Sequence, residues 1–129
     1  MLTAVSTPAA PSPAGHYAQA VLFGDLVFVS GQLPVDPEKG LVEPGTIEAQ
    51  TEQVLDNLAA ILKASGSDLD RVLKVTVYVS DITLWDRVNA VYARRFGDHR
   101  PARAVVPVKL LHHGYQIEIE AVAAVAVQP

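Results

Sequence analysis

Two glutamates are the only charged residues in a long apolar stretch near the end of the chain. Glu118 and Glu120 lie two positions apart among Ile, Val and Ala residues. In an extended strand such residues point to the same face, so the pair could do acid/base chemistry. Partial burial of at least one carboxylate would raise its pKa and let it hold or relay a proton. The alternative is that both are solvated on the polar face of an edge strand.

Arg103 begins another apolar stretch, within the segment PARAVV at 101–106. A guanidinium binds a carboxylate through two parallel, charge-assisted hydrogen bonds. Arg103 therefore indicates either a binding site for a small acid or a structural ion pair with Glu118 or Glu120 on a neighbouring strand. Composition favours neither interpretation.

Several other catalytic patterns are missing from the sequence. Cysteine is absent, which excludes disulfides, thiol catalysis and thiolate metal sites. The four histidines do not have the spacing of a metal site, and we expect His112 and His113 to lie in a solvated turn. No G-x-S-x-G, Walker or G-x-G-x-x-G pattern is present. We therefore expect neither a metal nor a phosphate-binding loop.

Residue type alone is less informative for Tyr17 and Asn89. Tyr17 precedes the first long apolar stretch and is either a phenol of a site or a packing aromatic. Asn89 lies on a predicted helix, where a surface or cap-like amide is the simple interpretation. On the same helix Trp85, Tyr92 and Phe96 form one stripe, which predicts that all three belong to the core.

Length and composition indicate one globular domain. The chain has 129 residues, of which 50% are hydrophobic and 19% charged, with a net charge of -4. Residues 1–14 are rich in Pro, Ser and Ala and predict a flexible arm, and residues 15–129 predict a single domain. The scattered basic residues argue against nucleic-acid binding. The lack of a signal peptide or a membrane span predicts a cytoplasmic protein.

The hydrophobic periodicity predicts an α+β fold with the order β-β-α-β-α-β-β. Short apolar runs separated by Gly24-Asp25 predict a hairpin, and three later runs predict further strands. Apolar residues at three- and four-residue steps predict two helices. The expected strands are 18–23, 26–30, 72–79, 102–108 and 115–127. The expected helices are 46–65 and a second one from 83 or 84 to about 96.

Two helices can cover only one face of this mixed sheet. The other face still carries many Val and Ala residues, and the chain holds no further element to cover it. Exposed apolar sheet surface of that extent is typical of an interface. The sequence therefore predicts an oligomer whose sheets pack against one another around a symmetry axis.

Seven segments of the sequence, taken in order, form a recognisable set. The segments are GHYAQA (15–20), FVSGQLPVDP (28–37), TEQVLDNL (51–58), KVTVYVSD (74–81), VNAVY (88–92), RPAR (100–103) and IEIEA (117–121). Their identities and order resemble the Rid family, also called YjgF/YER057c, the reactive-intermediate deaminases. The resemblance extends over residues 15–127.

This resemblance implies a chorismate-mutase-like fold and a homotrimer with clefts between subunits. It also implies hydrolysis of enamines and imines, of the 2-aminoacrylate and 2-iminopropanoate type, to 2-keto acids and ammonia. No metal or organic cofactor is implied. Two alternatives are a module of the same fold that binds 2-keto acids without turnover, and a ribonuclease or translation inhibitor. The acidic net charge argues against the ribonuclease.

The resemblance also implies roles for individual residues. Arg103 would clamp the substrate carboxylate, and Glu120 would position or activate the attacking water. The residues implied to line the cleft are Tyr17, Ser30, Gly31, Gln32 and Asn89. An imine carbon is already electrophilic, so orientation and one ordered water meet most of the demands of hydrolysis.

The chain departs from the common family pattern near the implied cleft. His16 stands where Pro is common, and Ala104-Val105 stand where Ser-Cys is common. Pro107 replaces a frequent Glu, and the pair His112-His113 replaces a Pro and a polar residue. These changes predict a pocket of altered size and polarity and an altered substrate preference.

Overall fold

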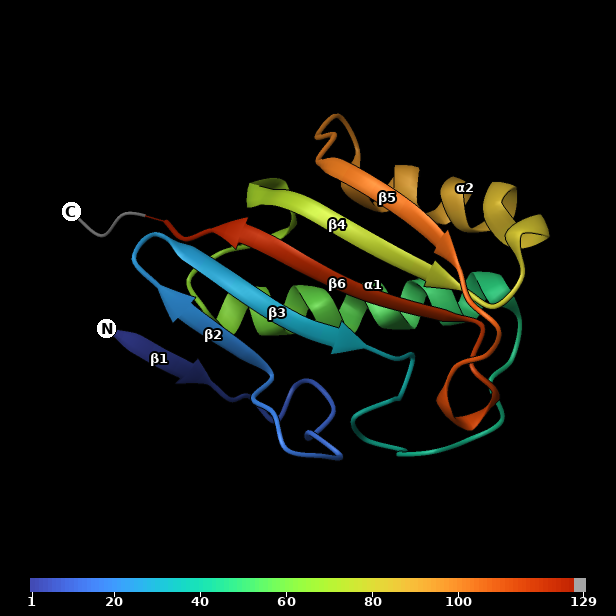
Figure 1. Cartoon of the computed structure of the whole chain (residues 1–129), viewed down its shortest axis with the longest axis horizontal. Helices are drawn as coiled ribbons and strands as arrows, with labels where there is room; N and C mark the ends of the chain where they lie inside the picture. Colours follow the sequence, from blue (N-terminus) through green and yellow to red (C-terminus); the bar gives the residue numbers. More distant parts are fainter. Residues whose placement is uncertain (127–129) are drawn as a thin grey trace.

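The computed structural model describes residues 1–126, which form a six-stranded mixed sheet and two α-helices (Figure 1). The strand order is β1-β2-β3-β6-β4-β5, and all neighbours are antiparallel except β4 and β5. The predicted α+β fold is confirmed. The elements are β1 (Leu2–Val5), β2 (Ala20–Phe23), β3 (Leu26–Gln32), α1 (Ile47–Ala64), β4 (Val72–Val79), α2 (Trp85–Phe96), β5 (Ala102–Pro107) and β6 (Ile117–Ala124).

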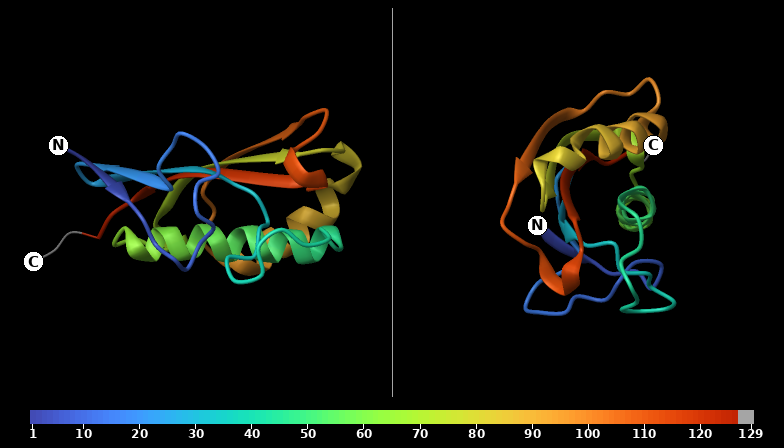
Figure 2. Two further views of the ribbon diagram at one scale, coloured as in Figure 1. Left: turned by 90° about the horizontal axis from the view of Figure 1, so that it is seen from below. Right: turned by 90° about the vertical axis from the view of Figure 1, so that its right-hand side faces the viewer.

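Both helices lie on the same face of the sheet, as the sequence predicts (Figure 2). Helix α1 begins where the Thr46 hydroxyl accepts a hydrogen bond from the Ala49 amide at 3.1 Å, which satisfies one of the free N–H groups of the first turn. It packs on β3 and β6. Helix α2 is the crossover between the parallel strands β4 and β5, and it packs against α1.

The core lies between the helices and the sheet, and strand alternation determines which side chains enter it. In β4 the three valines Val75, Val77 and Val79 are fully buried, and the residues between them face the other side. In β6, Ile117 and Ile119 are fully buried in the same way. The side chains of Glu118 and Glu120 therefore lie on the face that the helices do not cover.

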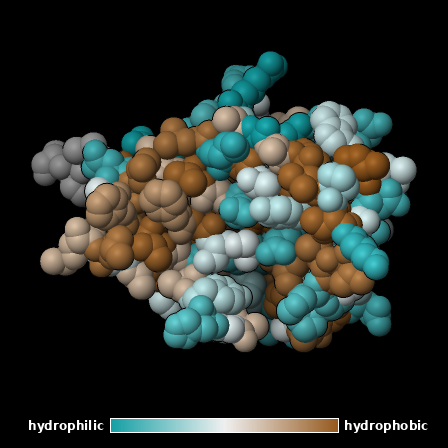
Figure 3. All heavy atoms as spheres, viewed as in Figure 1, coloured by the Kyte–Doolittle hydropathy of each residue, from teal (hydrophilic) through white to brown (hydrophobic). Residues whose placement is uncertain are grey.

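The face without helices is apolar at its β1–β3 end. Figure 3 shows this face, with hydrophobic residues gathered over the first strands. Leu2, Phe23 and Phe28 are 70%, 56% and 45% exposed. Strand pairing places them on one surface, because Leu2 pairs with Phe23, and Phe28 pairs with Val21, which lies two residues before Phe23 on the same face of β2. The predicted uncovered sheet face is present, and the oligomer that would cover it stays a prediction.

Two expectations from the sequence, and one alternative that it left open, are wrong in detail. Residues 2–5 of the supposed flexible arm form β1, which pairs with β2, because their alternating side chains suit an edge position. Strand β6 is central and not an edge strand. Trp85 is 38% exposed and outside the core, because it opens α2 and its ring lies over the guanidinium of Arg103.

Candidate functional site

A β-bulge in β3 lies directly opposite Glu120. Val29 pairs with Ala121 and Gln32 with Ile119, so that Ser30 and Gly31 together face the single residue between those partners. The bulge is fixed on its outer side, where the Ser30 amide donates to the Gln19 carbonyl at 2.9 Å. Bulges of this kind redirect side chains and are common beside functional sites.

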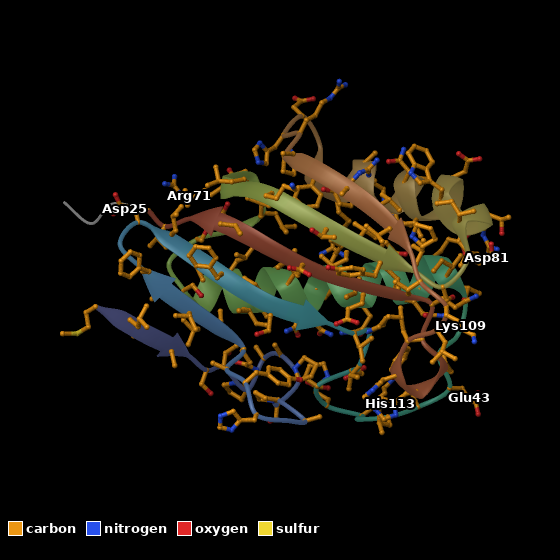
Figure 4. All side chains as sticks on the ribbon, in the orientation of Figure 1. Asp25, Glu43, Arg71, Asp81, Lys109 and His113 are labelled. Carbon is orange, nitrogen blue, oxygen red and sulfur yellow. The ribbon has the colours of Figure 1, made fainter. Side chains whose placement is uncertain are left out.

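The bulge forms the floor of a hollow of about 710 Å³. Its walls are loops from three parts of the chain, at 11–19, 33–41 and 110–113, and Figure 4 shows the last of these near the His113 label. We call it the tyrosine hollow and define it by Tyr17, Ser30, Gly31, Leu41, His112 and Glu118. Four of the five predicted cleft residues meet here, namely Tyr17, Ser30, Gly31 and Gln32. Gln32 also lines the hollow and is itself buried, with its amide nitrogen donating to the Ser30 carbonyl.

Tyr17 and Ser30 present polar atoms at this hollow. Tyr17 is 49% exposed, so it is not a packing aromatic in the single chain. Its hydroxyl accepts a hydrogen bond from the Ala14 amide at 3.2 Å. The Ser30 hydroxyl donates to the Ala18 carbonyl at 2.6 Å. Because each hydroxyl oxygen has two lone pairs, Ser30 can still accept a hydrogen bond from a ligand.

Glu118 is the only carboxylate among the residues that line the tyrosine hollow in the described chain, and it is half-buried. A Cβ atom at Gly31 would overlap its Oε2, so the lack of a side chain there lets the carboxylate lie against the bulge. Burial raises the pKa of Glu118, the nearby charge of Glu120 adds to the rise, and His112 opposes it. The predicted partial burial of one glutamate is therefore confirmed for Glu118.

A second hollow, of about 530 Å³, surrounds Arg103. We call it the arginine hollow and define it by Asn89, Tyr92, His99, Arg100 and Arg103. Nη1 of Arg103 donates to Oδ1 of Asn89 at 2.8 Å. The guanidinium carbon lies 4.7 Å from the ring centroid of Tyr92 and 5.5 Å from that of Trp85. A cation over an aromatic face is attracted to the ring, so both rings help to hold the guanidinium.

Tyr92 is buried beneath this guanidinium. Burial raises the pKa of its phenol to about 12, against a lowering by Arg103. The ring therefore stays neutral below that pH. A neutral phenol contacts Arg103 only through the π face of its ring. It therefore leaves the guanidinium free to bind a carboxylate through two hydrogen bonds.

Glu120 lines neither hollow among the described residues. Its exposed carboxylate accepts a hydrogen bond from the Tyr78 hydroxyl of β4 at 2.5 Å. That hydrogen bond raises the pKa of Tyr78. None of the ion pairs within residues 1–126 joins Arg103 to Glu118 or Glu120, so the structural ion-pair interpretation of Arg103 is wrong for the single chain.

The predicted site residues therefore divide into two groups on one chain. Arg103 pairs with Val75, which points to the helices, whereas Glu120 pairs with Thr76, which points away from them. Strand β5 also lies three strands from β3, about 14 Å at the usual strand spacing. One chain does not bring Arg103 together with Glu120 or with the tyrosine hollow.

Among the described residues, no group of three or more His, Asp or Glu side chains is placed to hold a metal ion. Within the same residues, no helix has the length and apolar character needed to cross a membrane.

Comparison with known proteins identifies the family. The model of the family described as Endoribonuclease L-PSP matches residues 7–125. The crystal structure of a protein from Yersinia pestis, described as belonging to the conserved Rid protein family, superposes with a TM-score of 0.92 at 39% identity and covers 97% of this chain and 100% of that one. The chain belongs to the Rid family. The predicted resemblance is confirmed.

Other Rid-family relatives carry differing names. A rat protein named 2-iminobutanoate/2-iminopropanoate deaminase is 44% identical over 119 residues, which are 92% of this chain and 87% of the rat protein. A Thermotoga maritima structure described as a putative endoribonuclease has a TM-score of 0.92 at 51% identity and covers 97% of this chain and 98% of that one. The family is therefore established more firmly than any one activity.

Two residues of interest escape the sequence analysis in part. Glu118 is visible as one of a pair, but only its position beside Gly31 distinguishes it from Glu120. Trp85 follows the core stripe of α2 and yet stacks on Arg103. The available signal was that Trp85 opens the helix, where a side chain can project past the sheet.

Proposed function

We propose that this protein hydrolyses reactive enamines and imines of the 2-aminoacrylate and 2-iminopropanoate type to 2-keto acids and ammonia. The observation that carries the proposal is the held guanidinium of Arg103. One of its nitrogens donates to Asn89 while two rings flank its carbon, which leaves the remaining N–H groups for a substrate carboxylate. The name of the rat relative, with 44% identity, supports this choice of substrate.

In this proposal Arg103 and Asn89 orient the substrate and Glu120 positions or activates the attacking water. Tyr17, Ser30 and Gly31 line the opposite wall of the cleft. No metal or organic cofactor takes part, because an imine carbon already accepts a water oxygen once water and substrate are aligned. The reaction therefore depends on position and on proton transfer.

The cleft in this proposal lies between subunits of a homotrimer. Arg103 and Glu120 face opposite sides of the sheet in one chain, so a substrate as small as 2-iminopropanoate needs a second copy to meet both. The exposed apolar surface at Leu2, Phe23 and Phe28 supports packing between sheets.

Direct kinetics test the proposal. An amino acid oxidase acting on alanine generates 2-iminopropanoate, and semicarbazide traps the imine that remains. We expect the wild type to speed its decay, and we expect Arg103→Ala and Glu120→Gln to lose most of that effect. If the wild type leaves the decay unchanged but binds pyruvate, a 2-keto acid binding module replaces the deaminase. RNA cleavage that survives Arg103→Ala would instead support the endoribonuclease named by the family model.

A further inference from the structure

Glu118 has a setting that the proposed roles do not use. Its half-buried carboxylate lines the tyrosine hollow together with Ser30 and Tyr17. In the part of the chain that the structure describes, no hydrogen bond reaches this carboxylate, whereas Glu120 accepts one from Tyr78. Partial burial disfavours the ionised form of this carboxylate and raises its pKa.

Gly31 makes this setting possible. Any side chain at position 31 would overlap Oε2 of Glu118, so the bulge in β3 and the carboxylate occupy adjoining space. The two glutamates are two residues apart on one face of β6, which places their Cβ atoms about 7 Å apart. A small planar substrate lying over the bulge can contact both carboxyl groups from one side.

We propose that Glu118 is the proton donor to the imine nitrogen, while Glu120 takes the proton of the attacking water. This inference rests on the proposed function and adds a second acid/base group to it. The two glutamates occupy different environments, one half-buried without a donor and the other exposed and hydrogen-bonded. Enzymes use such contrasts to assign acid and base roles to two carboxyl groups.

The proton transfers balance over one turnover. Water oxygen bonds to the imine carbon, its proton passes to Glu120, and the C=N electron pair moves to nitrogen, which takes the proton of Glu118. The product of this step is a carbinolamine, with Glu120 protonated and Glu118 ionised. In the second step Glu120 returns a proton to nitrogen, the C–N bond breaks to release ammonia, and the hydroxyl proton passes to Glu118 as C=O forms. Both side chains regain their starting states.

The pH dependence follows from the groups that face Glu118. Besides Glu120 on its own strand, these are His112 from the 112–114 turn, Tyr17 in the hollow and Tyr78 on β4. Burial raises the pKa of Glu118 above 4.5, so its protonated form persists to higher pH than that of an exposed glutamate. Because only this form donates, kcat falls as the pH rises through that pKa.

Glu118→Gln tests the proposal, because it keeps the shape of the side chain and removes the acid. We expect kcat for 2-iminopropanoate to fall about 10²-fold or more with KM little changed, and we expect the alkaline limb from Glu118 to vanish from the pH profile. Glu118→Asp should regain part of kcat. The matched control is Glu43→Gln, a glutamate on an exposed loop, which should retain the wild-type rate and profile.

Gly31→Ala tests the role of the Glu118 carboxylate in a second way. A Cβ there would push the carboxylate away, and we expect kcat to fall as in Glu118→Gln. The double variant should be no worse than either single one, because both act through one group. Circular dichroism and sedimentation would show that each variant folds and assembles.

The failures of the two proposals are distinguishable. If the wild type hydrolyses the imine and Glu118→Gln keeps both kcat and the alkaline limb, Glu118 is not the donor and the deaminase proposal stands. If the wild type has no imine hydrolysis, the deaminase proposal fails and the donor role fails with it.

Discussion

At the scale of single residues, Arg103 is held in place before any ligand arrives. Asn89 accepts from one side, and the rings of Tyr92 and Trp85 flank the guanidinium. A flexible arginine loses side-chain entropy when it binds, and such holding reduces that cost. The guanidinium of Arg103 is therefore preorganised to bind a carboxylate.

The first prediction uses Trp85, the single tryptophan of the chain. Its ring lies 5.5 Å from the Arg103 guanidinium carbon, so carboxylate binding at Arg103 should change tryptophan fluorescence. We expect pyruvate to give a saturable change in the wild type. Arg103→Lys loses the bidentate hydrogen bonds, and we expect its Kd to rise about ten- to a hundredfold.

Arg94→Lys is the matched control for this titration. Arg94 lies on the exposed side of α2 and pairs with Glu52, so its replacement should leave the pyruvate Kd unchanged. Equal weakening in both lysine variants would mean that general charge attracts the ligand and that Arg103 is no specific clamp.

Residue types predict the chemistry of this site better than its geometry. An arginine and two glutamates on apolar strands were enough to suggest carboxylate binding and acid/base work. Strand register decides the rest, because a shift by one residue moves a side chain to the other face. Only the pairing of Arg103 with Val75 and of Glu120 with Thr76 reveals that these side chains point apart.

At the scale of elements, buried amides fasten the loops that wall the tyrosine hollow. Gln19 is 3% exposed, and its side chain bonds three backbone positions of the N-terminal segment. Asn57 of α1 donates in the same way to the carbonyls of Leu33 and Val35 in the loop after β3. Two irregular segments thereby obtain the hydrogen bonds that a strand or helix would supply.

The second prediction concerns Gln19→Leu. The change removes the side-chain partner of the Thr7 amide and of the carbonyls of Thr7, Ala10 and Pro11, and we expect a loss of about 1–3 kcal/mol in the free energy of unfolding. Hydrogen exchange at Thr7 should become faster, since its amide now donates to Oε1 of Gln19 at 2.7 Å. The β4 amides are the internal control and should exchange as in the wild type. Unchanged exchange at Thr7 would show that β1 alone holds the segment.

The third prediction concerns the contact between the two helices. Arg95 of α2 is 23% exposed and bonds both Glu52 and Asp56 of α1. Its hydrogen bond lowers the pKa of Glu52 below 4.5. A lowered folded-state pKa means that this stabilisation is present above the unfolded pKa and is lost as the pH falls through the folded one. We expect Arg95→Met to weaken the acid dependence of unfolding below about pH 5.

Arg87→Met is the control for this pH effect. Arg87 lowers the pKa of Glu48 to about 2, but both partners are about half exposed, so salt screens the pair. In about 0.5 M salt, the acid dependence of unfolding of Arg95→Met should still differ from that of the wild type. That of Arg87→Met should equal the wild-type value. Denaturant titrations at several pH values measure the free energy of unfolding of each variant. The same pH dependence in both variants would contradict the prediction.

The helices and central strands could be predicted because their signals are local. Strand β4 matches its predicted bounds, since alternating valines mark one buried face. Strand β1 could not be predicted, because the first 14 residues have the composition of a loose segment. This segment is ordered by the pairing of β1 with β2 and by the side-chain amide of Gln19. Such partners lie far enough along the chain that no local pattern contains them.

At the scale of the whole molecule, the uncovered sheet face bears on both stability and function. Phe28 of β3 is one of the large exposed apolar side chains on the surface of β1–β3. We expect the wild type to sediment at three times the 13.8 kDa of one chain, and Phe28→Glu to dissociate because it places a charge in the interface. Val42→Glu changes a loop residue that is 50% exposed, against 45% for Phe28, and should leave the mass unchanged. A wild type that sediments as a monomer would remove the trimer and the shared cleft together.

The last prediction decides whether two subunits share one site. Arg103→Ala and Glu120→Gln should each be inactive alone. If the cleft joins Arg103 of one subunit to Glu120 of the next, a mixed trimer contains clefts in which both side chains are intact. Unfolding and refolding an equal mixture should then restore about a quarter of the wild-type activity, as random assembly in a closed ring requires. A site within one chain cannot be restored in this way, because every chain in the mixture carries one of the two defects. The double variant mixed with the wild type is the control for subunit exchange, and an inactive mixture of well-exchanged single variants would place both residues in one subunit's cleft.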